Sequence, residues 1–295
     1  NLVFDTRASG QDGDKVQGEA NEGIKTLRVI IVDTEKGIVD GNETRNFSSD
    51  GGDEFTKTLT IMGLPAGKKS FYIVANEESV GLELNSSLPK GEINLSDTLQ
   101  FLQTLVESKN FPRTDIAAKG LPIAGTASAN ITGAEDQTIE IPITRAVAKM
   151  ELTLTNATGG DFELNQVVLG SFFANSTYLF PQETALTLPG EVAYEGHRFQ
   201  TNETLSDGTS QTFHFYFYES NAKGRVYTIA LNAGADYAAA PIMLDEDTPL
   251  TSVARNTCLR VTGTIESVLE PVLTNLQIRV MPWDEKTDIT IPPFE

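Results

Sequence analysis

The sequence contains two histidines, His197 and His214, as the only candidates for the base of a Ser/His or Cys/His catalytic pair. Such a base activates a hydroxyl or thiol nucleophile. His214 alternates with phenylalanines in TFHFYFYES, which is typical of a histidine on one face of a strand. His197 lies in YEGHRFQ, with no cysteine, second histidine or paired carboxylate nearby at metal-ligand spacing. Neither histidine predicts a catalytic or metal site.

The acidic residues also fail to indicate a specific chemistry. Forty-one carboxylates always include candidates for a glycosidase pair, but no motif marks two of them. GQDGDK, SSDGGDE and LDEDTP carry oxygen ligands for Ca²⁺ without the spacing of an EF-hand, so solvated acidic turns are the preferred interpretation. No glycine-rich phosphate loop joins a strand to a helix. We therefore expect no enzyme, no cofactor and no metal.

Charge and composition limit the partners and the compartment. With 22 basic and 41 acidic residues the net charge is −19, which repels phosphate backbones and excludes nucleic acid as an expected partner. The single cysteine, Cys258, cannot form an intrachain disulfide, and the alternating stretch TCLRVTGTI predicts that it is a small buried side chain. No apolar run reaches the roughly 18 residues that a membrane span needs.

Apolar residues recur mainly with period two, which predicts half-buried strands along most of the chain. These segments are 24–33, 54–63, 69–76, 137–145, 146–156, 162–173, 211–220, 225–234, 256–266, 273–283 and 288–294. Residues 95–108 differ, because Leu99, Leu102, Leu105 and Val106 form a helical stripe. A single sheet would leave one apolar face in water, so we expect two layers per domain. The sequence thus predicts an all-β fold with one short helix in the N-terminal domain.

The domain organisation follows from length and from one proline. A chain of 295 residues favours two domains. The long strand pattern around Pro142 predicts a strand that changes from one sheet to another, because proline cannot donate to the ladder. We place the boundary near Ile143–Arg145, with an N-terminal leader over 1–23, an N-terminal β-sandwich domain over 24–143 and a C-terminal β-sandwich domain over 144–295.

Six segments, taken together and in order, resemble the fimbrillin family of Bacteroidales, the pilins of type V pili. They are FYIVAN at 71–76, LPIAGT at 121–126, TRAVAKMEL at 144–152, FYFYES at 215–220, NTCLRVTGTI at 256–265 and IRVMPW at 278–283. The resemblance implies two transthyretin-like β-sandwich domains, in agreement with the strand pattern. It also implies an extracytoplasmic lipoprotein precursor anchored in the outer membrane and then a cell-surface fimbria. The implied partners are other pilin subunits, in a homopolymer or mixed fimbria, an arginine-specific extracellular protease, and ligands on host or bacterial surfaces.

The resemblance gives the N-terminal sequence NLVFDTRASG a role. Pilins of this family are cut after an arginine followed by a small residue, and Arg7-Ala8 has that form. Leu2, Val3 and Phe4 then belong to the strand that processing discards. The polar run that follows is expected to be a flexible leader that gives the protease access to the site.

A sandwich that lacks one strand exposes an apolar trough and unpaired backbone groups, and these accept a strand of matching alternation. The C-terminal part, about 273–295, contains two candidate donor strands. The interpretation that both are ordinary terminal strands of the second domain stays open. The first piece contributes Leu276, Ile278 and Val280, and the second contributes Ile289 and Ile291.

The sequence analysis therefore predicts a structural pilin subunit that polymerises by protease-triggered donor-strand exchange after cleavage at Arg7-Ala8. The alternative is a surface adhesin or carbohydrate-binding lipoprotein of the same fold, at a fimbrial tip or without polymerisation. Exposed aromatic side chains would favour it, and Tyr216, Tyr218 and Trp283 are the candidates, although Trp283 is expected to pack at a strand end. A weaker third hypothesis is a hydrolase with two unmarked carboxylates.

Overall fold

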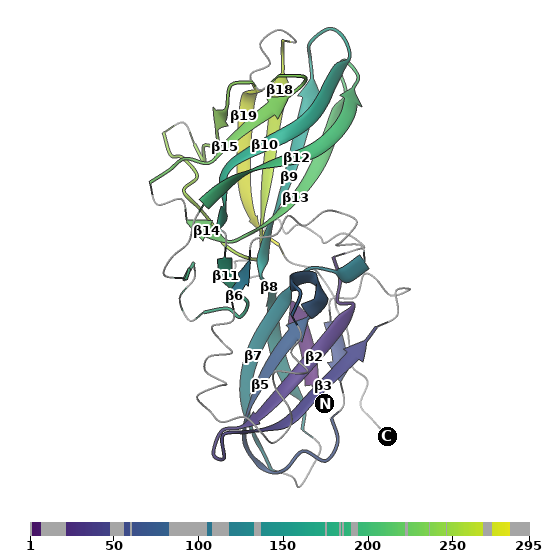
Figure 1. Ribbon diagram of the computed structural model, residues 1–295, viewed down its shortest axis with the longest axis vertical. Helices are drawn as coiled ribbons and strands as arrows, with labels where there is room; N and C mark the ends of the chain where they lie inside the picture. Colours follow the sequence, from purple (N-terminus) through teal and green to yellow (C-terminus); the bar gives the residue numbers. More distant parts are fainter. Residues whose placement is uncertain are drawn as a thin grey trace.

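The structure is a computed structural model and describes most of the chain. The described residues are 2–6, 22–47, 56–59, 61–82, 105–107, 118–132, 137–174, 176–182, 184, 186–189, 194–221, 224–235, 237–245, 247–267 and 273–283. They form an almost entirely β structure of two bodies stacked along the long axis, with β2, β3, β5 and β7 in one and β9 to β19 mainly in the other (Figure 1). This confirms the prediction of all-β sandwiches.

The N-terminal body is built on a seven-stranded sheet in the order β3-β2-β5-β7-β8-β1-β4. Neighbouring strands are antiparallel except for β1 and β8, which run parallel. A 3₁₀ turn, η2 (Glu77–Val80), follows β5. The strands are β1 (Leu2–Thr6), β2 (Thr26–Asp33), β3 (Ile38–Asn46), β4 (Thr56–Leu59), β5 (Gly67–Ala75), β7 (Ile123–Ile131) and β8 (Ile139–Arg145).

Both faces of β2 are buried, which explains why its sequence is almost continuously apolar. Leu27, Val29 and Ile31 face one core, which we call the N-terminal core, together with isoleucines of β8. Ile30 and Val32 face the opposite side, where a second cluster continues toward the other half of the molecule. The central strands of this sheet are therefore covered on both sides.

The C-terminal body contains two four-stranded sheets, β13-β9-β18-β19 and β12-β10-β15-β16. Their shared core, which we call the C-terminal core, contains the three phenylalanines of TFHFYFYES, while Tyr216 and Tyr218 lie on the opposite face of β13, as the alternation predicted. The strands are β9 (Val147–Asn156), β10 (Phe162–Ala174), β12 (Tyr194–Leu205), β13 (Ser210–Tyr218), β15 (Thr228–Asn232), β16 (Ala240–Pro241), β18 (Thr257–Ile265) and β19 (Leu273–Pro282).

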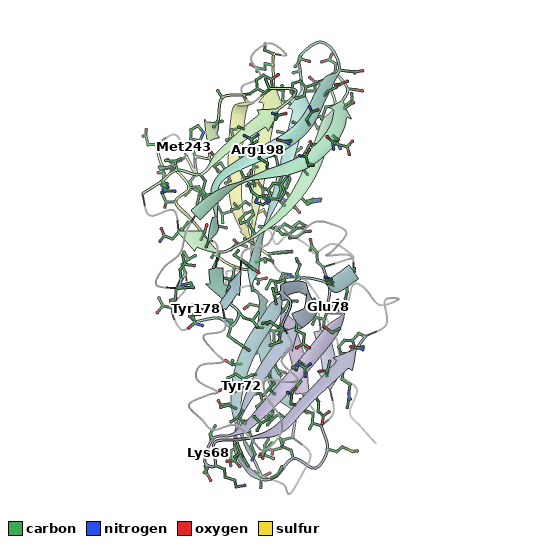
Figure 2. All side chains as sticks on the ribbon, viewed as in Figure 1. Lys68, Tyr72, Glu78, Tyr178, Arg198 and Met243 are labelled. Atoms are coloured by element: carbon green, nitrogen blue, oxygen red, sulfur yellow. The ribbon has the colours of Figure 1, made fainter. Side chains whose placement is uncertain are left out.

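A third buried cluster, which we call the junction core, joins the two bodies. It combines Tyr72 and Val74 of β5 with Phe180, Tyr218 and Trp283 from the C-terminal half. The Tyr72 and Phe180 rings meet edge to face, with their centroids 6.0 Å apart. Figure 2 shows Tyr72 on the N-terminal sheet and Tyr178 between the two halves. The bodies are therefore packed together by apolar side chains as well as joined by the chain.

The predicted helix over 95–108 is wrong where the structure describes it. Leu105–Glu107 forms β6, which pairs antiparallel with β11 (Ser176–Tyr178) next to the junction; the rest of the segment lies outside the described residues. A second short pair, β14 (Ser220–Asn221) with β17 (Ser252–Val253), lies in the C-terminal half. Pairing with a strand distant in the sequence has overridden the local helical pattern of Leu105 and Val106.

The chain passes from one sheet system to the other at Ala146. β8 ends at Arg145 and β9 begins at Val147, in different sheets. The domain bounds 24–143 and 144–295 stay a prediction.

Candidate functional site: the β1 slot

The first strand lies between two others, and we call β1 with its neighbours β8 and β4 the β1 slot. In the parallel pairing with β8, Leu2 lies opposite Ile139, and Phe4 lies opposite Ile141. In the antiparallel pairing with β4, Leu2 lies opposite Leu59. The backbone of β1 is therefore paired on both sides, although the strand has only five residues.

One side of the β1 slot is the neighbouring strand β8. Ile141 and Ile143 are 1% and 0% exposed in the N-terminal core, and Ile139 packs against the same core partly buried. Glu140 and Pro142 between them are exposed. Side chains alternate between the two faces of a strand, so the three isoleucines lie on one face of β8. A strand that pairs with β8 places every second side chain on that same face.

β8 also changes from one sheet partner to another, as the sequence predicted near Pro142. Thr144 and Arg145 pair with β7, whereas Ile139–Ile143 pair with β1. The change needs a close approach at Gly125 of β7, where a Cβ atom would lie 2.2 Å from the Pro142 carbonyl oxygen. Only glycine leaves room for this approach, so β8 can pair with β7 at its end and with β1 along the rest of its length.

The predicted processing residues directly follow β1 in the sequence. Leu2, Val3 and Phe4 all lie in β1. Arg7 and Ala8 lie outside the described residues, directly after the end of β1 at Thr6. The segment that the sequence analysis predicts to be discarded therefore contains the whole of β1.

The first candidate donor piece is an edge strand of the C-terminal sandwich. β19 pairs antiparallel with β18, and Val261, fully buried, lies opposite Ile278. Leu276 and Ile278 pack against the C-terminal core, whereas Val280 is 45% exposed. Ile289 and Ile291, from the second piece, lie outside the described residues.

A buried ionic cluster in the junction was not found by sequence reasoning. Lys149 Nζ lies 3.0 Å from Glu22 Oε1, and the two side chains are 0% and 1% exposed. The Tyr216 hydroxyl donates a hydrogen bond to the same oxygen, and Nζ also lies 3.4 Å from Glu151 Oε1. The signal was a lysine within the apolar run AVAKMEL, but its partner, 127 positions away, leaves no local trace. Glu22 and Gly23, the last two residues of the predicted leader, are buried.

A second buried ionic group lies at the far end of β5 from the junction. Lys69 Nζ is 2.7 Å from Asp33 Oδ2 and 2.5 Å from Asp40 Oδ2, and the lysine side chain is fully buried. Burial alone would lower the pKa of Lys69, but hydrogen bonds to the two carboxylates outweigh it and raise the pKa. The hydrogen bond from Lys69 holds the pKa of Asp33 well below 3.8. Lys36 Nζ also lies 3.4 Å from Asp33 Oδ2, so two lysines balance the two carboxylates at this end of the sheet.

The other candidate residues from the sequence analysis are buried or packed against neighbouring side chains. Cys258 is fully buried, as predicted, and burial raises the pKa of its thiol to about 12. Tyr216, Tyr218 and Trp283 are at most 2% exposed, so they form no open aromatic platform for a sugar. The His197 ring packs 4.9 Å from the Phe199 ring. Over the described part of the chain, no group of three His, Cys, Asp or Glu side chains could hold a metal ion.

Comparison with known proteins identifies the family. The model of a family described as major fimbrial subunit protein (FimA) matches residues 1–161, more than half of the chain. The chain belongs to the FimA family. Its members are fimbrial structural proteins and not enzymes, so this fimbrial subunit is not an enzyme and its place is the cell surface. A comparison with curated protein sequences found no match.

Solved structures show the same fold over almost the whole subunit. The tip fimbrial protein Mfa3 from Porphyromonas gingivalis, with a C-terminal truncation, has a TM-score of 0.60 and 15% identity, covering 96% of this chain and 98% of its own. A fimbrial assembly protein from Parabacteroides distasonis has a TM-score of 0.56 and 15% identity, covering 95% and 94%. The fimbrillin FimA from P. gingivalis W83 has a TM-score of 0.54 and 12% identity, covering 97% and 98%. Within the described residues, no helix is long and apolar enough to cross a membrane.

Proposed function

We propose that this fimbrial subunit polymerises by donor-strand exchange, triggered when a protease cuts the Arg7-Ala8 bond. The observation that carries the proposal is the position of β1. It ends at Thr6, one residue before the proposed cut, and it fills a place between two other strands. Cleavage there leaves β1 attached to the subunit only by noncovalent contacts.

Loss of β1 would leave a site between β8 and β4 that can bind a replacement strand. The facing edges of β8 and β4 lose their ladder partner, so backbone donors and acceptors open on both sides. Ile141 and Ile143, which are almost fully buried next to β1, would become more exposed to solvent. A replacement strand must therefore carry apolar residues at alternate positions and run parallel to β8 and antiparallel to β4.

The contacts of β19 favour the second C-terminal piece as the donor. Removing β19 would break its ladder with β18 and uncover Val261, and it would disturb Met281 and Trp283, which are 3% and 0% exposed in the junction core. Leu276, Ile278 and Val280 are then structural residues of the subunit. Ile289 and Ile291 follow in the sequence and have the alternation that the slot requires.

The test is polymerisation after limited digestion with an arginine-specific protease, followed by size-exclusion chromatography and electron microscopy. Wild type should lose residues 1–7 first and then form polymers that resist mild denaturant. Arg7→Lys, which keeps the positive charge but not the cleavage site, should stay uncut and monomeric.

A matched pair of variants tests the donor. Ile289→Asp should fold with wild-type stability, be cut normally and fail to polymerise, because the aspartate would enter an apolar pocket. Ile278→Asp should lower the stability of the uncut subunit, because it breaks contacts of β19 with the C-terminal core. Polymer formation by uncut Arg7→Lys, or normal polymers from Ile289→Asp, would refute the corresponding step.

A further inference from the structure

Lys69 lies between two carboxylates at the end of β5 that is far from the junction core. Its neighbour in the chain, Lys68, is labelled at this end of the molecule in Figure 2. Lys69 Nζ lies 2.7 Å from Asp33 Oδ2 and 2.5 Å from Asp40 Oδ2, and the three side chains are at most 9% exposed. Lys69 is on the same face of β5 as Phe71, which belongs to the N-terminal core. The amine and both carboxylates are therefore held at the end of an apolar core.

The pairing of strands brings these three side chains together. Asp33 is the last residue of β2 and lies directly opposite Lys69 in the antiparallel pair of β2 with β5. The register of β3 with β2 shifts at Asp40, which makes Asp40 the extra residue of a β-bulge. A bulge changes the direction of a side chain, and here the Asp40 carboxylate meets Lys69 Nζ. The arrangement thus depends on paired strands and not on a surface loop.

The two oxygens of Asp33 have different surroundings. Oδ1 accepts hydrogen bonds from the backbone N–H groups of Glu35 and Lys36, at 3.0 and 2.8 Å. Two N–H donors at such distances can stabilise the negative oxygen of a tetrahedral intermediate. Oδ2 is the oxygen in contact with Lys69 Nζ. Asp33 therefore has one oxygen held by the backbone and another next to an amine, as attack by that amine on the carboxyl carbon requires.

Asp40 is placed to carry the protons of such an attack. An amine attacks only in its neutral form, so the ammonium group of Lys69 must first give up a proton. Asp40 Oδ2 lies within hydrogen-bond distance of Nζ, and among the described residues its carboxylate is bonded only to Lys69. Away from water the charged forms are less favoured, which lowers the cost of moving the proton between the two groups. Asp40 can thus act as a general base and then as a general acid.

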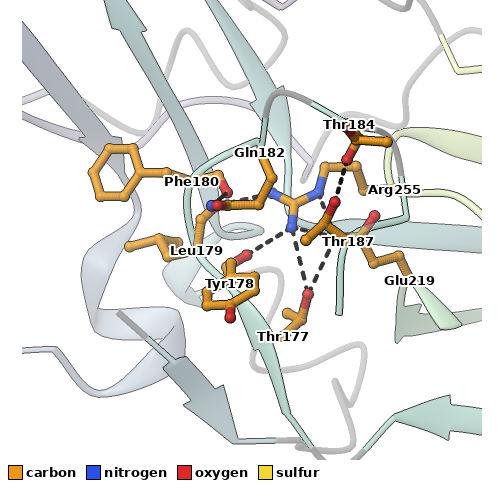
Figure 3. A network of polar contacts seen from close by, with 9 residues as sticks. All are labelled: Thr177, Tyr178, Leu179, Phe180, Gln182, Thr184, Thr187, Glu219 and Arg255. Carbon is orange, nitrogen blue, oxygen red and sulfur yellow. Dashed lines mark hydrogen bonds and ion pairs between the residues drawn. The ribbon is translucent and has the colours of Figure 1, made fainter. Parts of the chain in front are cut away.

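The ion pair of Arg255 shows why a buried cation alone is not enough. Figure 3 shows its guanidinium bonded to the carbonyl oxygens of Tyr178 and Leu179 and to the Glu219 carboxylate. A guanidinium stays protonated in proteins and therefore offers no neutral amine. This ion pair fixes the backbone around it and has no further chemistry.

Lys149 is the other fully buried lysine of the described residues, and its contacts are looser. Its Nζ lies 3.0 Å from Glu22 Oε1 and 3.4 Å from Glu151 Oε1. Glu22 Oε1 also accepts the Tyr216 hydroxyl, and Glu151 is also bonded to Arg260. Each carboxylate is therefore stabilised by a second donor, which makes it a weaker proton acceptor than Asp40.

We propose that Lys69 and Asp33 react within the folded subunit to form an amide bond between their side chains. Lys69 Nζ bonds to Asp33 Cγ, and the bond from Cγ to Oδ2 breaks. Two of the three protons of the ammonium group pass to Oδ2, one of them through Asp40, and the oxygen leaves as water. The positive and negative charges cancel, Asp40 ends unchanged, and no oxidant or cofactor is consumed.

The amide bond would join residues 36 positions apart and close a covalent ring that contains β3 and β4. β4 is one side of the β1 slot, so the ring would keep this strand close to the sheet whether or not β1 is present. The reaction uses no residue of β1 and does not rest on strand exchange. Its failure would leave the proposed assembly untouched.

Mass spectrometry of the full, uncut chain tests the bond. After incubation at neutral pH and unfolding in acid, the wild-type chain should be lighter than its sequence mass by one water molecule. Tryptic digestion should then give residues 29–36 joined to residues 69–90 through Asp33 and Lys69. The full sequence mass would overturn the proposal, and so would loss of water without this joined pair of peptides.

Three variants test the roles of the residues. Lys69→Arg keeps the positive charge without an amine that can attack, and should keep its full mass. Asp40→Asn keeps the side-chain shape but cannot take up the proton, and should stay mostly unlinked after the same incubation. Lys36→Arg is the matched control: Lys36 Nζ lies 3.4 Å from Asp33 Oδ2, but its side chain is 61% exposed and water keeps it protonated. This variant should form the bond as wild type does.

Thermal melts should show that each variant folds, and the joined peptides of the wild-type chain decide even if a buried variant does not. A link that forms in Lys69→Arg, or that is lost in Lys36→Arg, would overturn the assignment of the lysine. Complete linkage in Asp40→Asn would overturn the role of Asp40.

Discussion

Lys149→Met should destabilise the subunit strongly, because it removes the ammonium group that forms a buried ion pair with the Glu22 carboxylate. Both side chains are at most 1% exposed, and their charged atoms lie 3.0 Å apart. Removing one partner of such a pair costs about 3–5 kcal/mol, since the remaining charge stays out of water. Glu22 keeps the hydrogen bond from the Tyr216 hydroxyl, so we expect a loss of about 3–4 kcal/mol in the free energy of unfolding.

The assay is urea unfolding followed by tryptophan fluorescence. Trp283 is the single tryptophan of the chain, and the centre of its ring lies 5.6 Å from Lys149 Nζ. Its emission therefore reports directly on the junction core. Glu22→Gln should cost less than Lys149→Met, because the lysine keeps Glu151 at 3.4 Å.

The double variant Glu22→Leu/Lys149→Met supplies the control. Replacing both charges by apolar side chains removes the buried carboxylate together with its ammonium partner, so most of the lost stability should return. A loss below about 1 kcal/mol for Lys149→Met, the value of an exposed pair, would refute the reasoning. A double variant no more stable than the weaker single variant would do the same.

Three further predictions concern other parts of the subunit. The hydrogen bond from Lys69 holds the pKa of Asp33 below 3.8, so the stabilisation from this ion pair is present above about pH 4 and is lost as the pH falls below it. Urea unfolding from about pH 5 to pH 2 should show this loss in wild-type chain that has not formed the amide and much less of it in Asp33→Asn. Gly125→Ala places a Cβ atom 2.2 Å from the Pro142 carbonyl oxygen and should cost about 3 kcal/mol in thermal unfolding, whereas Gly160→Ala, which meets open space, should cost less than about 0.5; equal losses would contradict the crossing geometry. Arg255→Lys cannot bond both backbone carbonyls and the Glu219 carboxylate, so residues 176–182 should be cleaved faster in limited proteolysis, and an unchanged rate would contradict the role of the guanidinium.

The period-two alternation of apolar residues correctly predicted which face of a strand packs against a core. The alternation in TFHFYFYES correctly separated the phenylalanines of the C-terminal core from Tyr216 and Tyr218 on the other face. The same reasoning placed Cys258 inside and predicted a change of strand partner near Pro142, which the structure has between Ile143 and Thr144. It failed at Leu105 and Val106, whose helical spacing lost to pairing with β11, a strand about 70 residues later.

The sequence by itself determined the all-β class, the faces of the main strands and the family resemblance, because period-two burial and turn residues act over a few positions. Only the tertiary structure decided which strands pair, that β1 fills a place between β8 and β4, that Lys149 meets Glu22, and that Lys69 meets Asp33 and Asp40. These contacts join residues up to 137 positions apart, as Leu2 and Ile139 do. Their energies depend on how whole sheets pack, and no local window of the sequence contains both partners.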